Sequence, residues 1–250
     1  MTERRNERSE PTVAMREPEP AVAALVGDAG RQLRAPWAAS IAGLLFAALF
    51  TAAMLLLRSQ PMLGASDAEL ARQFAAGEDL AGLVGGLYLA PFAGIMFLWF
   101  IAVIRDQLGE REDRFFATVF FGSGLLFVAI FFVAVAVASW PIVAVRYLGF
   151  EAPSVREVEV TRSLSYALLF GYGTRASAVF LIAMSTVGLR GGVFPRGFAR
   201  TGYLVGAALL LVVVFWDWII LILPAWVAMV SLYILRRERA RQRMIALPAG

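Results

Sequence analysis

The chain has 250 residues, of which 60% are apolar and 17% are charged, and it contains neither Cys nor His. This composition excludes disorder for most of the length, and the missing residue types exclude disulfides, Cys/His zinc sites, His-ligated haem, thiol nucleophiles and Ser-His catalysis. All 23 basic residues are Arg, scattered between apolar blocks with a net charge of +4, so no nucleic-acid partner is indicated.

The N-terminal segment 1–34 is predicted to be cytoplasmic and largely disordered. Residues 1–20 are rich in Arg, Glu and Pro, a composition that buries too little apolar surface to fold. Residues 21–34 are expected to form a short amphipathic helix at the inner membrane surface.

The rest of the chain consists of apolar blocks long enough to cross a bilayer, which requires about 20 apolar helical residues. The last block, 201–235, is interrupted only by Asp217. As one helix it would extend about 52 Å, beyond a hydrocarbon core of roughly 30 Å, so we expect it to divide at residues 215–218, where Trp and a charge favour the interface. The predicted spans are 37–57, 80–104, 115–139, 163–189, 198–214 and 219–235.

The distribution of Arg favours six spans over five. With six spans and both termini inside, thirteen Arg near the membrane are cytoplasmic and five, namely Arg58, Arg72, Arg146, Arg156 and Arg162, are outside. With five spans the basic tail moves outside, the split becomes eight to ten, and the usual inward bias is lost. The cytoplasmic set is Arg31, Arg34, Arg105, Arg111, Arg114, Arg190, Arg196, Arg200, Arg236, Arg237, Arg239, Arg241 and Arg243.

Two segments outside the membrane carry further expectations. Residues 66–77 begin with a capping-box pattern and end at Gly77, which predicts a helix. Leu70 and Phe74 share one face of it, so we expect this helix to lie on the outer membrane surface. The acidic loop 146–162 is expected to be solvated.

The turn 105–114 is rich in charged residues, and its positive and negative charges nearly cancel. A metal site at Glu110, Glu112 and Asp113 is the less favoured interpretation, because interleaved Arg residues neutralise the carboxylates.

Arg175 is the sharpest candidate for function, because it lies about 18 Å into the fourth span. A central Arg costs on the order of 3 kcal/mol to insert. Gly171 and Gly173 could expose backbone carbonyls to it, and Tyr172 could offer a ring face. One interpretation is that Arg175 and Tyr172 bind a lipid phosphate or small carboxylate between helices. The alternative is structural: Arg175 extends outward or pairs with Asp217.

Small residues recur at helical spacing on three spans. Such residues let helix backbones approach closely, which predicts internal packing, with a homodimer or partner-protein face as the alternative. The second and fifth spans carry Gly82, Gly86, Ala90, Gly94, Gly202 and Gly206, and the first carries Ala39, Gly43 and Ala47.

Two stretches carry a family resemblance. They are Phe97-Leu98-Trp99-Phe100-Ile101 through Arg105-Asp106 to Gly109–Phe115, and Ala225-Trp226 to Leu235. Over residues 37–237 the chain resembles a family of uncharacterised six-span integral membrane proteins from actinobacteria. The resemblance implies the six-span arrangement and the division near Asp217, and it implies no activity or functional residue.

The sequence thus predicts an all-α bundle of six transmembrane helices in a bacterial plasma membrane, with a basic cytoplasmic tail at 237–250. The favoured function is a non-enzymatic accessory or interaction protein, with membrane lipids, a homo-oligomer or a membrane partner protein as partners. The alternative is a small transporter or lipid- or anion-binding protein centred on Arg175. An enzyme is disfavoured, because no carboxylate pair or metal constellation is recognisable, and no cofactor is expected.

Overall fold

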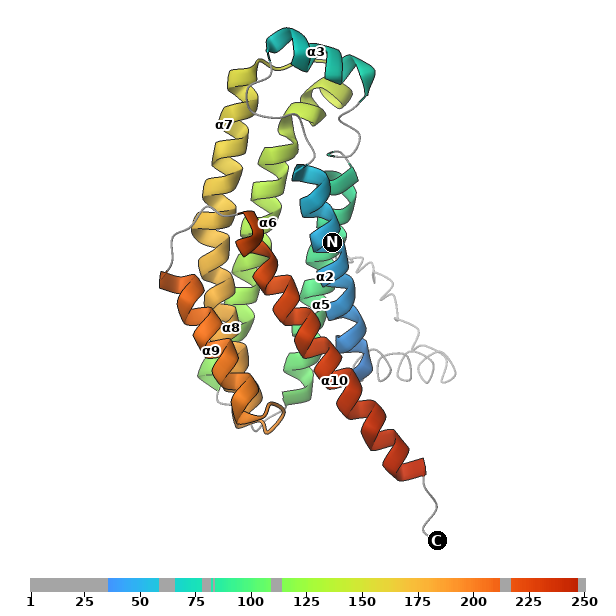
Figure 1. Ribbon diagram of the computed structural model, residues 1–250, viewed down its shortest axis with the longest axis vertical. Helices are drawn as coiled ribbons and strands as arrows, with labels where there is room; N and C mark the ends of the chain where they lie inside the picture. The colour runs from blue at the N-terminus through green and yellow to red at the C-terminus, as the bar shows by residue number, and fades with distance from the viewer. Residues whose placement is uncertain are drawn as a thin grey trace, which may run out of the picture. The chain divides into compact units, whose positions relative to one another are not determined.

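The computed structural model describes residues 36–58, 66–77, 82, 84–108, 114–211 and 217–246, all within one compact unit (Figure 1). These residues form helices and no strand. In chain order the elements are α2 Pro36–Arg58, α3 Asp67–Ala76, the π-helix η1 Val84–Leu89, α5 Ala90–Leu108, α6 Arg114–Leu148, α7 Val155–Tyr166, the π-helix η3 Ala167–Gly173, α8 Thr174–Arg190, α9 Arg196–Leu211, the 3₁₀-helix η4 Asp217–Leu221 and α10 Ile222–Ala246.

Successive long helices run in opposite directions (Figure 1). A Cβ at Gly43 of α2 would meet Ser231 of α10, whereas Arg58 at the other end of α2 meets Trp218, so α2 and α10 are antiparallel. Gly202 of α9 in the same way faces Ser185 of α8. Helix α3 lies at one end of the bundle, which we call the α3 end (Figure 1). The opposite end carries the start of α2 and the ends of α8 and α10.

Five helical stretches in the described residues are long and apolar enough to cross a membrane: Trp37–Arg58, Val84–Asp106, Phe115–Leu148, Val155–Arg190 and Trp218–Ala240. The prediction of an all-helical, membrane-embedded chain is confirmed at this level. Within the last block the structure describes two separate elements, α9 ending at Leu211 and η4 beginning at Asp217, and residues 212–216 lie outside the described residues. With 16 residues, α9 is shorter than the five long stretches.

Two predicted boundaries at the α3 end are wrong. The third span was expected to end at 139, but α6 continues through Pro141 to Leu148. The loop predicted at 146–162 is helical from Val155 onwards, and α7, η3 and α8 form one stretch of 36 residues. Ser154 caps α7: the Glu157 amide donates to Ser154 Oγ at 3.4 Å, and the Ser154 amide donates to Glu157 Oε2 at 2.8 Å.

Helix α3 forms where the capping pattern predicts it, with the Glu69 amide donating to Ser66 Oγ at 3.2 Å and Gly77 at a φ of 78°. Its expected position on the lipid surface is wrong. Leu70 and Phe74 are 2% and 6% exposed, because they pack against Ile142 near the end of α6. Burial of these three side chains stabilises the contact between α3 and the part of α6 that extends beyond Pro141.

Two hydrogen bonds fix both ends of α3 on the neighbouring helices. The Val155 amide at the start of α7 donates to Asp67 Oδ1 at 2.8 Å. At the other end of α3, Arg146 Nη2 of α6 donates to the Phe74 carbonyl at 2.8 Å. The helix is therefore part of a folded cap over α6 and α7.

The centre of the bundle is a cluster of buried phenylalanines from four helices. Phe97 of α5 lies with its ring centroid 4.5 Å from that of Phe46 of α2 and 5.0 Å from that of Phe180 of α8. Its centroid is 5.6 Å from that of Phe127 of α6. Aromatic packing of this density holds the helices together where lipid supplies no hydrophobic drive.

Several sequence predictions fall on residues outside the described ranges. These are the segment 1–34, with its disorder and amphipathic helix, and the acidic cluster of Glu110, Glu112 and Asp113. The predicted basic tail is helical as far as it is described, since α10 runs to Ala246. Arg237 Nη1 of this helix donates to the Val193 carbonyl at 3.0 Å, which attaches α10 to the α8–α9 loop.

Candidate functional site

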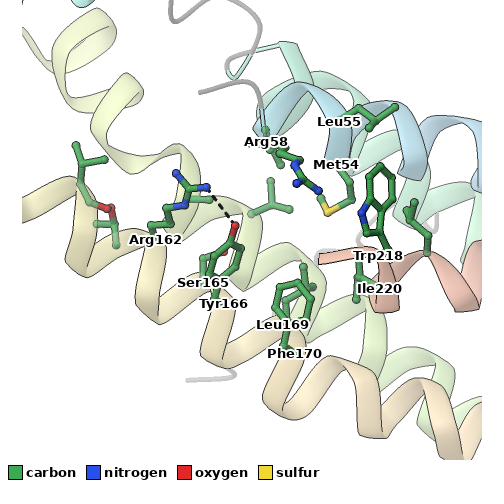
Figure 2. Close-up of a pocket in the computed structure, with 16 residues that line it drawn as sticks. Met54, Leu55, Arg58, Arg162, Ser165, Tyr166, Leu169, Phe170, Trp218 and Ile220 are labelled. Atoms are coloured by element: carbon green, nitrogen blue, oxygen red, sulfur yellow. Dashed lines mark hydrogen bonds between the residues drawn. The ribbon is translucent and has the colours of Figure 1, made fainter. Parts of the chain in front are cut away.

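A cavity of about 130 Å³ opens near the α3 end, between α2, α6, α7, η3 and η4 (Figure 2). Its size approaches the roughly 150 Å³ at which an engineered apolar protein cavity binds benzene. A mostly apolar cavity with a few convergent polar groups is the usual form of a small-molecule site.

Two arginines from different helices line the cavity. Figure 2 shows Arg162 beside Tyr166 on one side and Arg58 beside Trp218 on the other. Arg162 Nη2 donates to the Tyr166 hydroxyl at 3.2 Å, with its Cζ 5.5 Å from the ring centroid. Arg58 Cζ lies 5.1 Å from the centroid of the Trp218 ring. Aromatic faces attract guanidinium groups, so a ring lies beside each arginine at the cavity wall.

The sequence sets Arg58 and Trp218 at helix ends, whereas Arg162 and Tyr166 lie within the continuous stretch of α7, η3 and α8. Arg58 is the last residue of α2, Trp218 follows the first residue of η4, and Tyr166 is the last residue of α7. Arg and aromatic residues are the types that favour the membrane–water interface. This preference agrees with the presence of cations and rings around one cavity.

The remaining wall is apolar and continues from the arginines toward the bundle. It includes Leu57 of α2, Val135 of α6, Leu169 and Phe170 of η3, and Leu221 of η4. Thr161 and buried Ser165 add two hydroxyls from α7. Asp and Glu are absent from the described residues that line the cavity, so its described charges are both positive.

Arg175 lies outside this cavity. Its Nη1 donates to the carbonyls of Phe170 at 3.2 Å and of Gly171 at 2.5 Å, so the expected exposure of backbone carbonyls to the guanidinium is seen. The expected ring contact is wrong: Tyr172 is 66% exposed, and the cation–π contacts of the described residues include none between it and Arg175. The side chain of Asp217, the other expected partner, is outside the described residues.

The small residues lie at contacts between helices. Added Cβ atoms at Gly86 and Gly202 would overlap the hydroxyls of Ser139 and Ser185. A Cβ at Gly94 would overlap the Phe132 ring, and one at Gly206 would lie 3.0 Å from the Ala178 carbonyl oxygen. Gly82 and Ala90 are also buried. Internal neighbours therefore occupy the face that the sequence offered to a partner protein.

Sequence reasoning missed Arg58, Arg162 and Trp218 as members of one site. Arg58 and Arg162 were placed in separate outer loops, and no spacing links residues so far apart in the chain. The available signal was partial: both are Arg at the edge of an apolar block. In the described part of the chain, no group of three or more Asp or Glu residues could hold a metal ion.

No protein-family model, curated protein or solved structure matches this chain. The resemblance to actinobacterial six-span membrane proteins therefore stays a prediction, and the cavity itself is the basis on which function can be inferred.

Proposed function

We propose that this protein binds an anionic lipid in the cavity between α2, α6, α7 and η4. The observation that carries the proposal is that two guanidinium groups, Arg58 of α2 and Arg162 of α7, line a mostly apolar cavity whose described lining carries no carboxylate. A lipid phosphate would accept hydrogen bonds from both groups, and the start of an acyl chain would lie against Leu169 and Phe170. The cavity holds a group of about this size, and the rest of the lipid stays in the bilayer.

The depth of the cavity supports a ligand from the membrane. The rise from Trp37 to Arg58 along α2 is about 31 Å, and from Phe170 to Arg190 about 30 Å. Both match the hydrocarbon thickness of a bilayer, roughly 30 Å. If Trp37 and Arg190 lie at one membrane surface, Arg58 lies at the level of the opposite lipid head groups, and Arg162 lies roughly 12 Å further out along its helix than Phe170.

The proposed setting is a bacterial plasma membrane crossed six times, with both termini in the cytoplasm. The excess of Arg at the end opposite α3 supports this orientation through the positive-inside rule. The antiparallel course of α8, α9 and α10 supports six crossings. The cavity would then receive lipids of the outer leaflet.

Single cysteines test this topology, because the chain contains no Cys of its own. Ala152, Gly191 and Ala240 are exposed positions, so Ala152→Cys, Gly191→Cys and Ala240→Cys suit labelling with a membrane-impermeant maleimide. In intact cells we expect only the cysteine at 152 to react, and all three to react after permeabilisation. Labelling at 240 in intact cells would contradict the six-span arrangement.

Lipid retention tests the binding proposal. We expect native mass spectrometry of the wild-type protein to show retained phosphatidylglycerol, and titration to show preference for it over phosphatidylcholine. Arg58→Gln/Arg162→Gln is expected to lower phosphatidylglycerol affinity at least about ten-fold, because two charge-assisted hydrogen bonds are lost.

The matched control is Arg72→Gln/Arg156→Gln. It removes the same charge from the α3 end at exposed residues that do not line the cavity. Retention in this control should equal that of the wild type. An equal loss in both double variants would indicate general surface attraction, and a wild type without preference for the anionic lipid would overturn the proposal.

The interaction role expected from the sequence has less support. Gly86, Gly94, Gly202 and Gly206 contact other helices of the same chain, so they are not available for a partner without rearrangement. We infer binding of a lipid without chemical conversion as the simpler function of this site.

A further inference from the structure

The π-helix η3 forms part of the cavity wall and is the point where α7 passes into α8. The Thr174 amide donates to the Leu169 carbonyl, five residues earlier rather than four. Leu169 and Phe170, both buried, lie in this segment and line the cavity. Because π-turns shift the hydrogen-bond register by one residue, they change the direction of side chains and are frequent at functional sites.

Three side chains at the start of α8 donate to the carbonyls of η3. Thr174 Oγ1 donates to Leu169 O at 3.2 Å, and Ser177 Oγ donates to Gly173 O at 2.9 Å. Arg175 makes two such bonds, with one nitrogen directed to both Phe170 O and Gly171 O. The guanidinium is the only charged group among these three donors, so its bonds are the strongest of the set.

The direction of Arg175 explains how it reaches these carbonyls. Side chains in a helix lean toward its N-terminus, and residues four and five positions earlier lie directly in this direction. The Gly171 carbonyl is four residues before Arg175 and the Phe170 carbonyl is five, so both lie within reach of the guanidinium. The arginine is half-buried and does not line the cavity.

We propose that Arg175 is a positioning residue, which holds η3 in its π-helical form and thereby keeps Leu169 and Phe170 in the wall of the lipid cavity. This inference rests on the proposed function of that cavity. It assigns the two kinds of recognition to different residues: Arg58 and Arg162 bind the anionic head group, and Arg175 acts through the backbone on the surface that receives the acyl chain.

The test compares Arg175→Leu with Arg175→Lys by titrating the purified protein with phosphatidylglycerol and with phosphatidylcholine. Arg175→Leu is expected to lower the affinity for both lipids by a similar factor, about ten-fold, because the apolar wall that both lipids contact is altered. The preference for phosphatidylglycerol should therefore persist. Arg175→Lys, which keeps a cationic donor, is expected to restore most of the affinity.

Hydrogen–deuterium exchange supplies a readout on the backbone itself. Amides in residues 167–175 are expected to exchange faster in Arg175→Leu, and at rates near the wild type in Arg175→Lys. Thr174→Val removes only the side-chain bond from Thr174 Oγ1 to Leu169 O and keeps the backbone bond, so it serves as a milder second variant should Arg175→Leu fail to fold. Like Arg175→Leu, Thr174→Val is expected to speed amide exchange in residues 167–175 and to lower the affinity for both lipids.

The outcomes separate this inference from the proposed function. Wild-type affinity in Arg175→Leu would overturn the positioning role while lipid binding stands. Loss of the preference for phosphatidylglycerol in Arg175→Leu would show that Arg175 contacts the head group, which also overturns the positioning role. A wild-type protein without any preference would overturn the proposed function, whatever the variants do.

Discussion

Replacement of Gly43 by Leu is expected to destabilise the bundle by about 3 kcal/mol or more, at the upper end of the cost of overpacking a core. A Cβ at this position would overlap Ser231 Oγ of α10 and lie 2.9 Å from the Phe100 ring of α5. Both neighbours are fully buried, so neither can move into free space. The added leucine therefore forces α2 away from α5 and α10 together.

The measurement is unfolding of the purified protein in mixed micelles of increasing SDS content. Gly122→Leu is the matched control, since Gly122 is a helical, exposed glycine of α6 with nothing within 4 Å of an added Cβ. It should leave stability nearly unchanged. Equal unfolding midpoints for both variants would mean that Gly43 is not a close-contact position.

The same contact type recurs at three places. Gly43 faces Ser231, Gly86 faces Ser139 and Gly202 faces Ser185, and each serine hydroxyl is buried without a hydrogen-bond partner in the structure. A serine against a glycine lets two helix backbones approach closely, as small residues do in membrane bundles.

Phe97→Ala is the second change with a large expected effect, about 3 to 5 kcal/mol of lost stability. The ring is 0% exposed and contacts aromatic rings from α2, α6 and α8. Its removal leaves a cavity among helices that cannot all close around it, so packing contacts are lost on several sides.

Phe92→Ala is the matched control, because it removes the same atoms from another position of the same helix, α5. Phe92 is 56% exposed, so truncation should cost less than about 1 kcal/mol. Thermal unfolding in detergent, followed by circular dichroism, measures both. The central role of the phenylalanine cluster would be refuted by a Phe97→Ala variant as stable as Phe92→Ala.

The features that depend on local sequence were predictable. Apolar blocks of sufficient length gave the membrane-crossing helices, because transfer of a helix into lipid depends on its own residues. The cap at Ser66 followed from a local hydrogen-bonding pattern. The equally local pattern at Ser154 and Glu157 was available and would have placed the start of α7 correctly.

The tertiary structure decided what local pattern could not. Leu70 and Phe74 form an apolar face that suits either lipid or protein, and the extension of α6 past Pro141 determined that it meets Ile142. Arg58, Arg162 and Trp218 come from three helices distant in sequence, so only the packing of those helices shows that they share a cavity. The sequence by itself determined that the chain is helical and membrane-embedded, because hydropathy and length act within each segment. The position of the candidate site was decided by contacts between segments, which no single segment encodes.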